Sequence, residues 1–337
     1  LSITLLEGRD RVGGRVYSLD HMPGHPEVGA NAILGAYARV KDASERYDIK
    51  LVDHLPRATL NRTKTLVLDG NSVSPKDWPS SLRNVLPEQH KETMPWAYVP
   101  RSISPNNPLK SLEDIYDPSF AQYDKPVYEF LRGIGASDEA IDLTYNTNVI
   151  YGTSALDASL LHMFADDFFI RQQVSMERRM FIGDGGNMRV PEGMASQIKA
   201  DILFNRKVVG LRTDSTGVDV YCRDGSRYRA RFVICSVPVP VLRHIDIDPA
   251  IPGLQGEAIK RVVYCPCTQI HMIAKRPFWN EDGLPAYMWT DGVAGFVVPN
   301  RVPHNPKEVL SLTAWGRGFL ARYLDSIGPV AASAAVI

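Results

Sequence analysis

The chain has no excess charge of either sign, few cysteines and no long apolar run. Its 337 residues include 38 Lys and Arg and 38 Asp and Glu, so the formal net charge is zero. This balance argues against a broad basic surface for nucleic acid. No apolar stretch approaches the roughly 20 residues that cross a bilayer. We therefore expect a soluble, cytoplasmic protein without a membrane span.

Cysteine is too scarce to staple a fold of this length with disulfides. The four cysteines are Cys222, Cys235, Cys265 and Cys267. The last two flank a proline, but no second pair of Cys or His lies at zinc-site spacing. The sequence therefore predicts free thiols and no bound metal, in agreement with a reducing compartment.

Several segments have the pattern of β-strands. Residues 2–7 and 232–235 are apolar runs that predict buried strands. Asp69 and Gly70 stand between two apolar segments and predict a hairpin turn. Two further strands are expected at residues 270–274 and 309–315.

Helical patterns occupy the stretches between these strands. They run over residues 121–131 and 137–161. Another helix is expected with Pro191 near its first turn and residues 192–200 as its body. Helices and strands mixed in this way predict an α/β protein.

The residues that follow the first strand carry the strongest chemical pattern. Glu7 ends the strand, and an acidic residue in that position can accept hydrogen bonds from both ribose hydroxyls of a dinucleotide. Gly13 and Gly14 let the backbone approach a diphosphate closely. Arg11 and Arg15 can offset its charge with forked donors. The spacing E-x3-R-x-G-G-R favours this interpretation over a β-turn with surface arginines.

This segment resembles the second strand and following loop of the flavin-containing amine oxidase family, which includes monoamine oxidases, polyamine oxidases and L-amino-acid oxidases. The resemblance implies that FAD is the cofactor and that Glu7 binds its adenosine ribose. It also implies that four residues lie along the FAD diphosphate: Arg11, Gly13, Gly14 and Arg15.

Later motifs resemble the same family in the same order. Gly29 and Ala30 resemble the loop beside the isoalloxazine ring. Val208 resembles a strand residue whose backbone contacts adenine, and Pro238 resembles the turn that returns beneath the FAD. Two other family motifs are resembled by residues 185–194 and 277–279.

The resemblance implies a Rossmann-like FAD-binding domain interleaved with a mixed α+β substrate-binding domain. We expect residues 1–70 and 185–250 in the first domain, and residues 71–184 and 251–337 in the second. The family's opening G-x-G-x-x-G strand and its last FAD-binding segment have no counterpart in the sequence. We therefore expect the complete protein to be longer, or the missing parts to come from another chain.

The substrate half departs from the family pattern at the position of a lysine that positions a water. Gln269 stands there as the candidate catalytic residue, and a glutamine can hold a water but supplies no charge. The arginine that L-amino-acid oxidases of the family often have three residues after the loop glycine is absent after Gly29, which favours an amine substrate or a substrate carboxylate held elsewhere. The aromatic residues expected to form a cage for the substrate nitrogen are Tyr287, Trp289 and Phe296.

The function implied by the resemblance is oxidation of a C–N bond in a small-molecule amine or amino acid. Hydride transfer to flavin gives an imine, and molecular oxygen then gives hydrogen peroxide. Two alternatives stay open: another flavin oxidase or desaturase of a biosynthetic pathway, which Gln269 favours slightly, and an inactive truncated relative. The substrate, covalent attachment of the flavin and the oligomeric state also stay open, with a homodimer as one arrangement.

Overall fold

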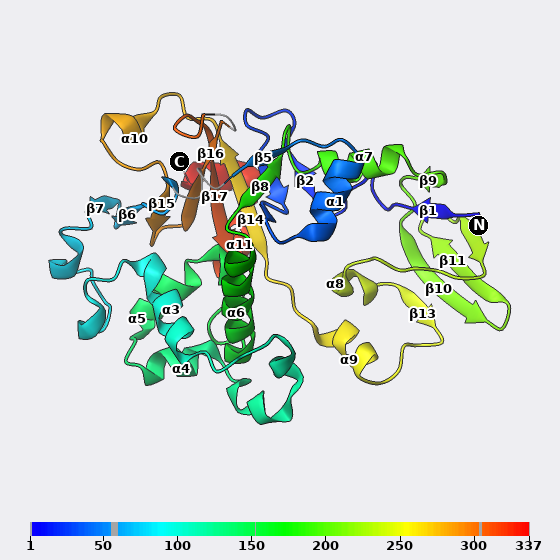
Figure 1. Cartoon of the computed structure of the whole chain (residues 1–337), viewed down its shortest axis with the longest axis horizontal. Coiled ribbons are helices and arrows are strands. Elements are labelled where there is room, and N and C mark those ends of the chain that lie inside the picture. Colours follow the sequence, from blue (N-terminus) through cyan, green and yellow to red (C-terminus); the bar gives the residue numbers. More distant parts are fainter. Residues whose placement is uncertain (1, 55–59, 152, 303–304, 337) are drawn as a thin grey trace. The chain divides into compact units, whose positions relative to one another are not determined.

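A computed structural model of the chain describes residues 2–54, 60–151, 153–302 and 305–336 (Figure 1). The fold divides into two compact units, each built from two stretches of sequence. Unit 1 comprises Leu1–Val16 and Met188–Tyr264, and unit 2 comprises Tyr17–Asn187 and Cys265–Ile337. Both contain helices and sheets, so the expected α/β class is confirmed. The FAD-binding domain expected over residues 1–70 and 185–250 and the substrate-binding domain expected over residues 71–184 and 251–337 stay predictions, because they concern cofactor and substrate roles.

Unit 1 contains two small sheets. In one, β1 (Thr4–Leu6) pairs in parallel with β9 (Asp201–Leu203). In the other, the strand order is β12-β11-β10-β13. Its strands are β10 (Val208–Asp214), β11 (Gly217–Cys222), β12 (Arg227–Ala230) and β13 (Asp246–Asp248). The helices of the unit are α7 (Arg189–Ser196), α8 (Val239–Leu242) and α9 (Gly253–Arg261).

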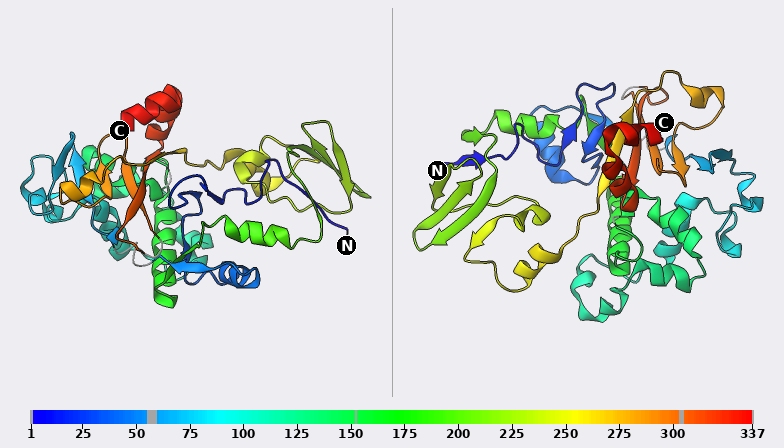
Figure 2. Two further views of the ribbon diagram at one scale, coloured as in Figure 1. Left: turned by 90° about the horizontal axis from the view of Figure 1, so that it is seen from above. Right: turned by 180° about the vertical axis from the view of Figure 1, so that it is seen from behind.

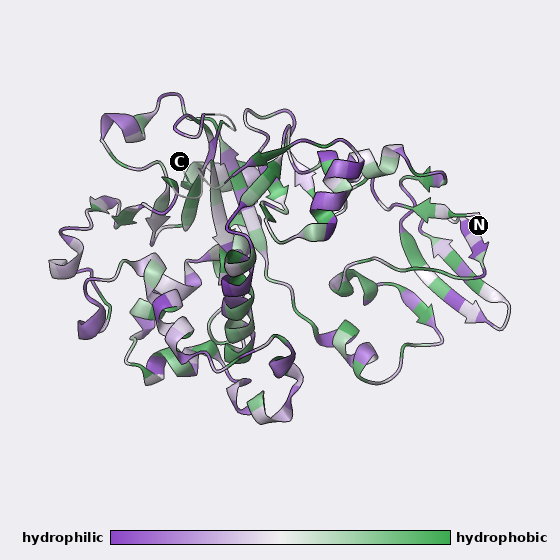
Figure 3. Ribbon diagram, in the orientation of Figure 1, coloured by the Kyte–Doolittle hydropathy of each residue, from purple (hydrophilic) through white to green (hydrophobic). Residues whose placement is uncertain are grey.

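Two strands of the four-stranded sheet of unit 1 differ in how apolar residues are distributed along them. In Figure 3, hydrophobic and hydrophilic residues alternate along β11, whereas β10 is mostly apolar from Val208 to Leu211 and hydrophilic from Arg212 to Asp214. Gly225 has a φ of 88° in the turn between β11 and β12, a value that glycine adopts without strain. This turn keeps the two strands in antiparallel register.

Two expectations about buried strands in unit 1 are corrected. Residues 232–235 are not in a strand, and Phe232 and Ile234 are 77% and 95% exposed. The first strand does form, but Ile3 beside it is 61% exposed. An apolar run becomes a buried strand only when neighbouring strands and helices cover it, and such cover is a long-range property.

Unit 2 is organised around a six-stranded mixed sheet with the order β14-β17-β16-β15-β6-β7. Its strands are β6 (Thr65–Leu68), β7 (Asn71–Val73), β14 (Cys267–Met272), β15 (Met288–Thr290), β16 (Phe296–Arg301) and β17 (Val309–Arg317). The expected hairpin joins β6 to β7, with positive φ at both Asp69 and Gly70. The two strands expected near residues 270 and 310 are confirmed as β14 and β17.

Helices cover both faces of this sheet within unit 2. On one face, Leu66, Trp289 and Phe296 pack in a large core with residues of α3 (Pro95–Ile103) and α6 (Leu160–Met176) (Figure 1). On the other face, a smaller cluster includes Leu312 and Ala314. There α11 (Phe319–Val336) lies against β14 and β17 (Figure 2). None of the helices in the described ranges is long and apolar enough to cross a membrane.

The remaining elements of unit 2 are short. The small sheets contain β2 (Tyr17–Ser18) and β3 (Glu27–Gly29), and β4 (Ile33–Leu34), β5 (Leu51–Asp53) and β8 (Met180–Gly183). The other α-helices are α1 (Ala38–Arg46), α4 (Val127–Gly133), α5 (Asp138–Ile141) and α10 (Phe278–Glu281). The 3₁₀ turns are η1 (Trp78–Ser80), η2 (Glu88–His90), η3 (Ser104–Asn106), η4 (Glu113–Tyr116), η5 (Pro118–Tyr123) and η7 (Val149–Tyr151).

The helix expected over residues 137–161 is broken into pieces. After α5, a π-helical turn, η6 (Asp142–Asn146), widens the backbone, and α6 begins only at Leu160. Arg317 explains part of the break, because its Nη2 donates to the Tyr145 carbonyl at 2.8 Å and its Nε donates to the Asn146 carbonyl at 3.3 Å. The Arg317 side chain thus supplies donors to backbone carbonyls at the point where the helix stops.

Candidate functional site

The loop that follows β1 keeps a carboxylate oxygen available. The backbone N–H of Glu7 donates to the Leu203 carbonyl at 2.9 Å, which fixes the residue at the end of the parallel pair. Its Oε1 accepts from the Arg9 N–H at 2.8 Å. Its Oε2 has no hydrogen-bond or ion-pair partner within the part of the chain that the structure describes. Glu7 is thus held in place through one oxygen and can accept hydrogen bonds through the other.

The two glycines of the loop have different surroundings. Gly13 has a φ of 93°, and a Cβ there would lie 2.8 Å from Met188 Sδ and 2.9 Å from the Val16 carbonyl. Gly14 has a φ of 54°, and a Cβ there would meet no atom within 4 Å. Gly13 is therefore required by the packing of the loop itself. Gly14 faces open space, where a phosphate group of a ligand can approach the protein backbone.

The two arginines of the loop also differ. The guanidinium of Arg11 donates to three carbonyls of its own loop, those of Val12, Gly14 and Val16, at 2.9 to 3.2 Å. Arg11 therefore braces the loop conformation. Arg15 is exposed and lies over the Tyr264 ring, 5.6 Å from its centroid, with no acidic partner among the described residues. Arg15 is thus the arginine whose charge is available to an anion.

These features fit the ADP portion of FAD. The loop of unit 1 offers a carboxylate oxygen for ribose hydroxyls, an open glycine and an exposed guanidinium within nine residues of sequence. Val208 begins β10 in the same unit and is half-buried, and Pro238 precedes α8. The cofactor roles of these residues stay predictions that the local geometry supports.

Gly29 and Ala30 lie in a braced corner of unit 2. Ala30 has a φ of 48°, in the left-handed region that few residues other than glycine adopt. Its carbonyl accepts a hydrogen bond from Asn187 Nδ2, and the Asn187 N–H donates to Glu27 Oε1 at 2.6 Å. Asn187 is thus the residue that holds the backbone around Gly29 in this unusual conformation.

The sheet face around Gln269 carries three buried polar atoms without hydrogen-bond partners among the described residues. They are Gln269 Oε1, His271 Nε2 and Trp315 Nε1. Gln269 and His271 are two residues apart on β14, so their side chains share one face. Register places Gln269 opposite Trp315 on β17. Because buried polar groups are nearly always satisfied, three orphans on one face indicate a place for water or a polar ligand.

A polar network adjoins these orphans. His271 Nδ1 lies 2.9 Å from Thr313 Oγ1, and Asn300 Nδ2 donates to the same oxygen at 2.9 Å. Burial lowers the pKa of His271, and the nearby His21 lowers it further, so the imidazole is neutral at neutral pH. The face therefore offers an acceptor, an indole donor and a neutral imidazole.

The three aromatic residues expected to surround a substrate are core residues. Tyr287, Trp289 and Phe296 are 9%, 1% and 5% exposed. Trp289 Nε1 donates to the Leu143 carbonyl at 2.9 Å, and the Tyr287 and Trp289 rings each meet Phe296 edge-on. Phe296 in turn lies opposite Trp315 on β17, in the same cross-strand row as Gln269. The aromatic cluster thus continues the face that carries Gln269, and its role toward substrate stays a prediction.

Sequence reasoning did not single out Trp315 and gave His271 no role. Strand alternation could have found His271, because it lies two residues after Gln269 on an expected strand. Trp315 needed the register between β14 and β17, which joins residues 46 positions apart.

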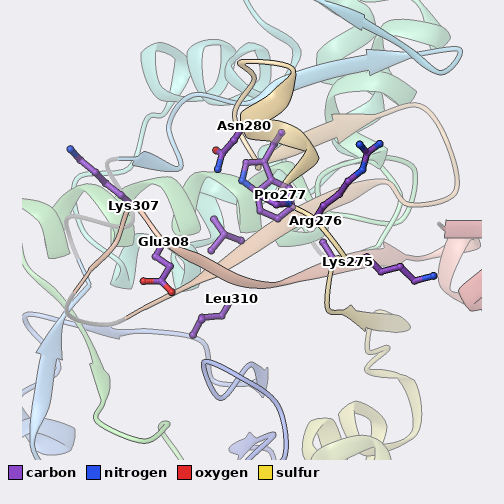
Figure 4. Close-up of a pocket in the computed structure, with 10 residues that line it drawn as sticks. Lys275, Arg276, Pro277, Asn280, Lys307, Glu308 and Leu310 are labelled. Atoms are coloured by element: carbon purple, nitrogen blue, oxygen red, sulfur yellow. The ribbon is translucent and has the colours of Figure 1, made fainter.

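A pocket of about 330 Å³ lies elsewhere in unit 2, between residues 274–280 and 307–310 (Figure 4). Lys275 and Lys307 extend from it in different directions, and Arg276 pairs with Glu281 at 2.8 Å. The cations do not converge on one point, and none of the expected site residues lines the pocket.

Comparison with known proteins shows which family the chain resembles. A family model described as flavin containing amine oxidoreductase matches residues 1–326. An L-amino-acid oxidase of Crotalus adamanteus is 24% identical over 300 residues, covering 84% of this chain and 55% of that protein. A probable flavin-containing monoamine oxidase A of Dictyostelium discoideum is 23% identical over 125 residues, covering 37% of this chain and 27% of that protein. The chain thus spans about half the length of the L-amino-acid oxidases it matches.

Solved structures show the same fold. Wild-type putrescine oxidase bound to putrescine superposes with a TM-score of 0.70 at 19% identity, covering 98% of this chain and 73% of that chain. Cyclohexylamine oxidase from Brevibacterium oxydans superposes with a TM-score of 0.65 at 18% identity, covering 97% and 76%. With a family model matched along nearly its whole length, the chain belongs to the flavin-containing amine oxidoreductases.

Proposed function

We propose that the protein is an enzyme that oxidises a C–N bond of an amine or amino acid with FAD, giving an imine and hydrogen peroxide. The observation that carries the proposal is the loop after β1, where Glu7, Gly14 and Arg15 all keep groups free for a dinucleotide. When bound, FAD supplies the hydride acceptor for the carbon that bears the nitrogen. Molecular oxygen is the proposed second substrate.

The residues of unit 1 would bind and orient the cofactor. Glu7 Oε2 would accept from the ribose hydroxyls, and Arg15 would offset the diphosphate charge with its exposed guanidinium. Gly14 would let the phosphates approach the backbone closely. Arg11 would act on the loop rather than on the cofactor, since it already donates to three loop carbonyls. The domain roles expected from the sequence are part of this proposal.

The residues of unit 2 would act on the substrate side. Gln269 Oε1 would hold a water by accepting its hydrogen bond, and the Trp315 indole would donate to a second polar atom. His271, kept neutral by burial, would add no positive charge beside an amine nitrogen. These groups would position a small polar molecule without holding a formal charge themselves.

A substrate of the amine or amino-acid class is supported by the relatives. The matched curated protein is an L-amino-acid oxidase, and the matched structures are oxidases of putrescine and cyclohexylamine. Gln269 favours a second candidate, a flavin oxidation or desaturation of another bond, because it carries no charge at the position of the family lysine. Peroxide formed without loss of the amine nitrogen would support that candidate.

The test is FAD binding followed by peroxide production. The protein should bind FAD, show flavin absorption bands and release peroxide with putrescine, cyclohexylamine or an L-amino acid. Glu7→Gln should weaken FAD binding about tenfold or more, since hydrogen bonds to a charged group contribute about 1.5–3 kcal/mol. Glu257→Gln is the matched control, because that carboxylate on α9 pairs only with exposed Lys260 and Arg261 within the described residues. A protein that binds no FAD would contradict the proposal.

A further inference from the structure

Four polar side chains form a hydrogen-bonded row across the six-stranded sheet of unit 2. Ser311 and Thr313 lie two residues apart on β17, so their side chains share one face. Register places Asn300 of β16 opposite Ser311. It also places His271 of β14 opposite Thr313. Ser311 and Thr313 are 1% and 3% exposed, so their hydroxyls need hydrogen-bond partners inside the protein.

The direction of the hydrogen bonds in this row is set at a backbone carbonyl. Ser311 Oγ lies 3.4 Å from the Pro23 carbonyl, which can only accept, so the Ser311 hydroxyl donates there. The Asn300 atom that faces Ser311 must then be a donor, and it is Nδ2, 3.1 Å from Ser311 Oγ. The same Nδ2 donates to Thr313 Oγ1 at 2.9 Å. Asn300 thus supplies a proton to both hydroxyl oxygens.

The Thr313 hydroxyl proton has a single acceptor within the described ranges of the chain. Thr313 Oγ1 already accepts from Asn300, and its other polar neighbour there is His271 Nδ1 at 2.9 Å. Because a buried hydroxyl needs an acceptor, Nδ1 is the unprotonated nitrogen of the ring. A neutral imidazole carries one proton, which therefore lies on Nε2. His271 Nε2 is buried and has no hydrogen-bond partner among the described residues.

We propose that Asn300 and Thr313 are positioning residues that fix His271 in the tautomer protonated at Nε2, which makes this buried atom a hydrogen-bond donor. On the same face, Trp315 Nε1 is a second donor and Gln269 Oε1 an acceptor, and neither has a hydrogen-bond partner in the described part of the chain. Two donors and one acceptor match the oxygen of a water or hydroxyl group, which accepts two hydrogen bonds and donates one. They do not match an ammonium group, which only donates.

The role of this donor toward a substrate rests on the proposed function, whereas the position of the proton does not. The hydrogen bonds of the row join side chains and one carbonyl of this chain alone, so the tautomer can be measured in protein that makes no peroxide. Failure to bind FAD would contradict the proposed function and leave the tautomer unchanged. A proton on Nδ1 of His271 would overturn this inference and leave the proposed function standing.

The experiment measures which imidazole nitrogen of His271 is protonated, by NMR of the full chain with isotope-labelled histidine. The signals are assigned by their loss in His271→Gln, and the spectra are taken at about pH 9, well above the usual histidine pKa of about 6.5. In the wild type, Nε2 should carry the proton. Thr313→Val removes the hydroxyl and should shift the tautomer ratio about fivefold toward Nδ1, the factor that corresponds to one net hydrogen bond. Thr313→Ser should keep the wild-type ratio, and an unchanged ratio in Thr313→Val would overturn the proposal.

Asn300→Asp should reverse the row, because it replaces an amide donor by a carboxylate acceptor of nearly the same shape. The Thr313 hydroxyl should then donate to the carboxylate and accept from His271 Nδ1, so that Nε2 loses its proton. Asn280→Asp is the matched control, since it adds the same charge at an exposed position on α10 and should keep the wild-type tautomer. A folded Asn300→Asp variant that keeps the proton on Nε2 would overturn the proposal. If circular dichroism shows that this variant does not fold, the two Thr313 variants decide the question.

Discussion

Unit 1 and unit 2 differ in how they use apolar side chains. In unit 2, Trp78, Tyr98 and Trp289 are fully buried in one continuous core between sheet and helices. In unit 1, Phe232 and Ile234 are mostly exposed, and the order of the four-stranded sheet is supported by charged pairs along β11 and β12. The difference teaches that the buried aromatic residues of unit 2 are first packing residues, whereas two residues of unit 1, Glu7 and Arg15, keep polar groups without a hydrogen-bond or ion-pair partner among the described residues.

The largest effect should come from the core of unit 2. Trp289→Ala removes a ring that is 1% exposed, its hydrogen bond to the Leu143 carbonyl and its edge contact with Phe296. We expect the free energy of unfolding to fall by about 3–5 kcal/mol. Urea unfolding followed by far-ultraviolet circular dichroism measures this.

Tyr116→Ala is the control for this prediction. Tyr116 is an aromatic residue of unit 2 that is 83% exposed, so its removal should change the free energy of unfolding by less than about 0.5 kcal/mol. Equal unfolding midpoints for the two variants would show that the core does not stabilise unit 2 as described.

A smaller loss should follow from one glycine in the corner of unit 2. Gly186 has a φ of 100°, and a Cβ there would lie 2.6 Å from Ser18 Cβ. Ser18 Oγ donates to Glu27 Oε2 at 2.9 Å, so the collision also disturbs the residue that accepts from Asn187. We expect Gly186→Ala to destabilise the protein by about 2–3 kcal/mol.

Gly70→Ala separates backbone strain from collision. Gly70 has a φ of 73° in the hairpin turn but no atom within 4 Å of a Cβ. We expect a loss of only about 1 kcal/mol there, from the conformation alone. Thermal unfolding of both variants tests the comparison, and equal losses would show that the contact with Ser18 relaxes freely.

The parts of the fold that the sequence predicted correctly depend on local sequence patterns. Asp69 and Gly70 require positive φ in a two-residue hairpin, and this requirement is readable from the residues themselves. The strands over β14 and β17 were readable from their apolar runs. The pattern from Glu7 to Arg15 likewise pointed to a loop in which Gly14 faces open space, and the role of that loop toward a dinucleotide stays a prediction.

The features that the sequence predicted wrongly or missed depend on contacts between residues far apart in the chain. Residues 232–235 have the composition of a buried strand, but burial depends on neighbours far away in sequence. The break in the helix over residues 137–161 involves Arg317, which lies more than 170 positions after the carbonyls it binds. Trp315 lies opposite Gln269 because of the register between β14 and β17, which the sequence alone does not give. Periodicity reports which face a residue lies on, and it does not report which residue it faces.

The smallest effect concerns the charged pairs of unit 1 and depends on pH. Asp219 on β11 is 6% exposed and accepts from Arg227 Nη2 at 2.7 Å and from Arg229 Nη1 at 2.8 Å. The hydrogen bond from Arg227 lowers the pKa of Asp219. A depressed folded-state pKa stabilises the fold above the unfolded pKa of about 3.9, and this stabilisation is lost as the pH falls through the folded value.

Thermal unfolding between about pH 6 and pH 3 tests this role of Asp219. Asp219→Asn should lower the melting temperature at the upper end, where the carboxylate is charged. The difference from the wild type should shrink toward the lower end, where the wild-type carboxylate begins to be protonated. Asp246→Asn, at an exposed position on β13, should follow the wild type throughout. A difference between Asp219→Asn and the wild type that is constant at every pH would mean that Asp219 stabilises the sheet by shape rather than by charge. Charged pairs would then not distinguish the stability of unit 1 from that of unit 2.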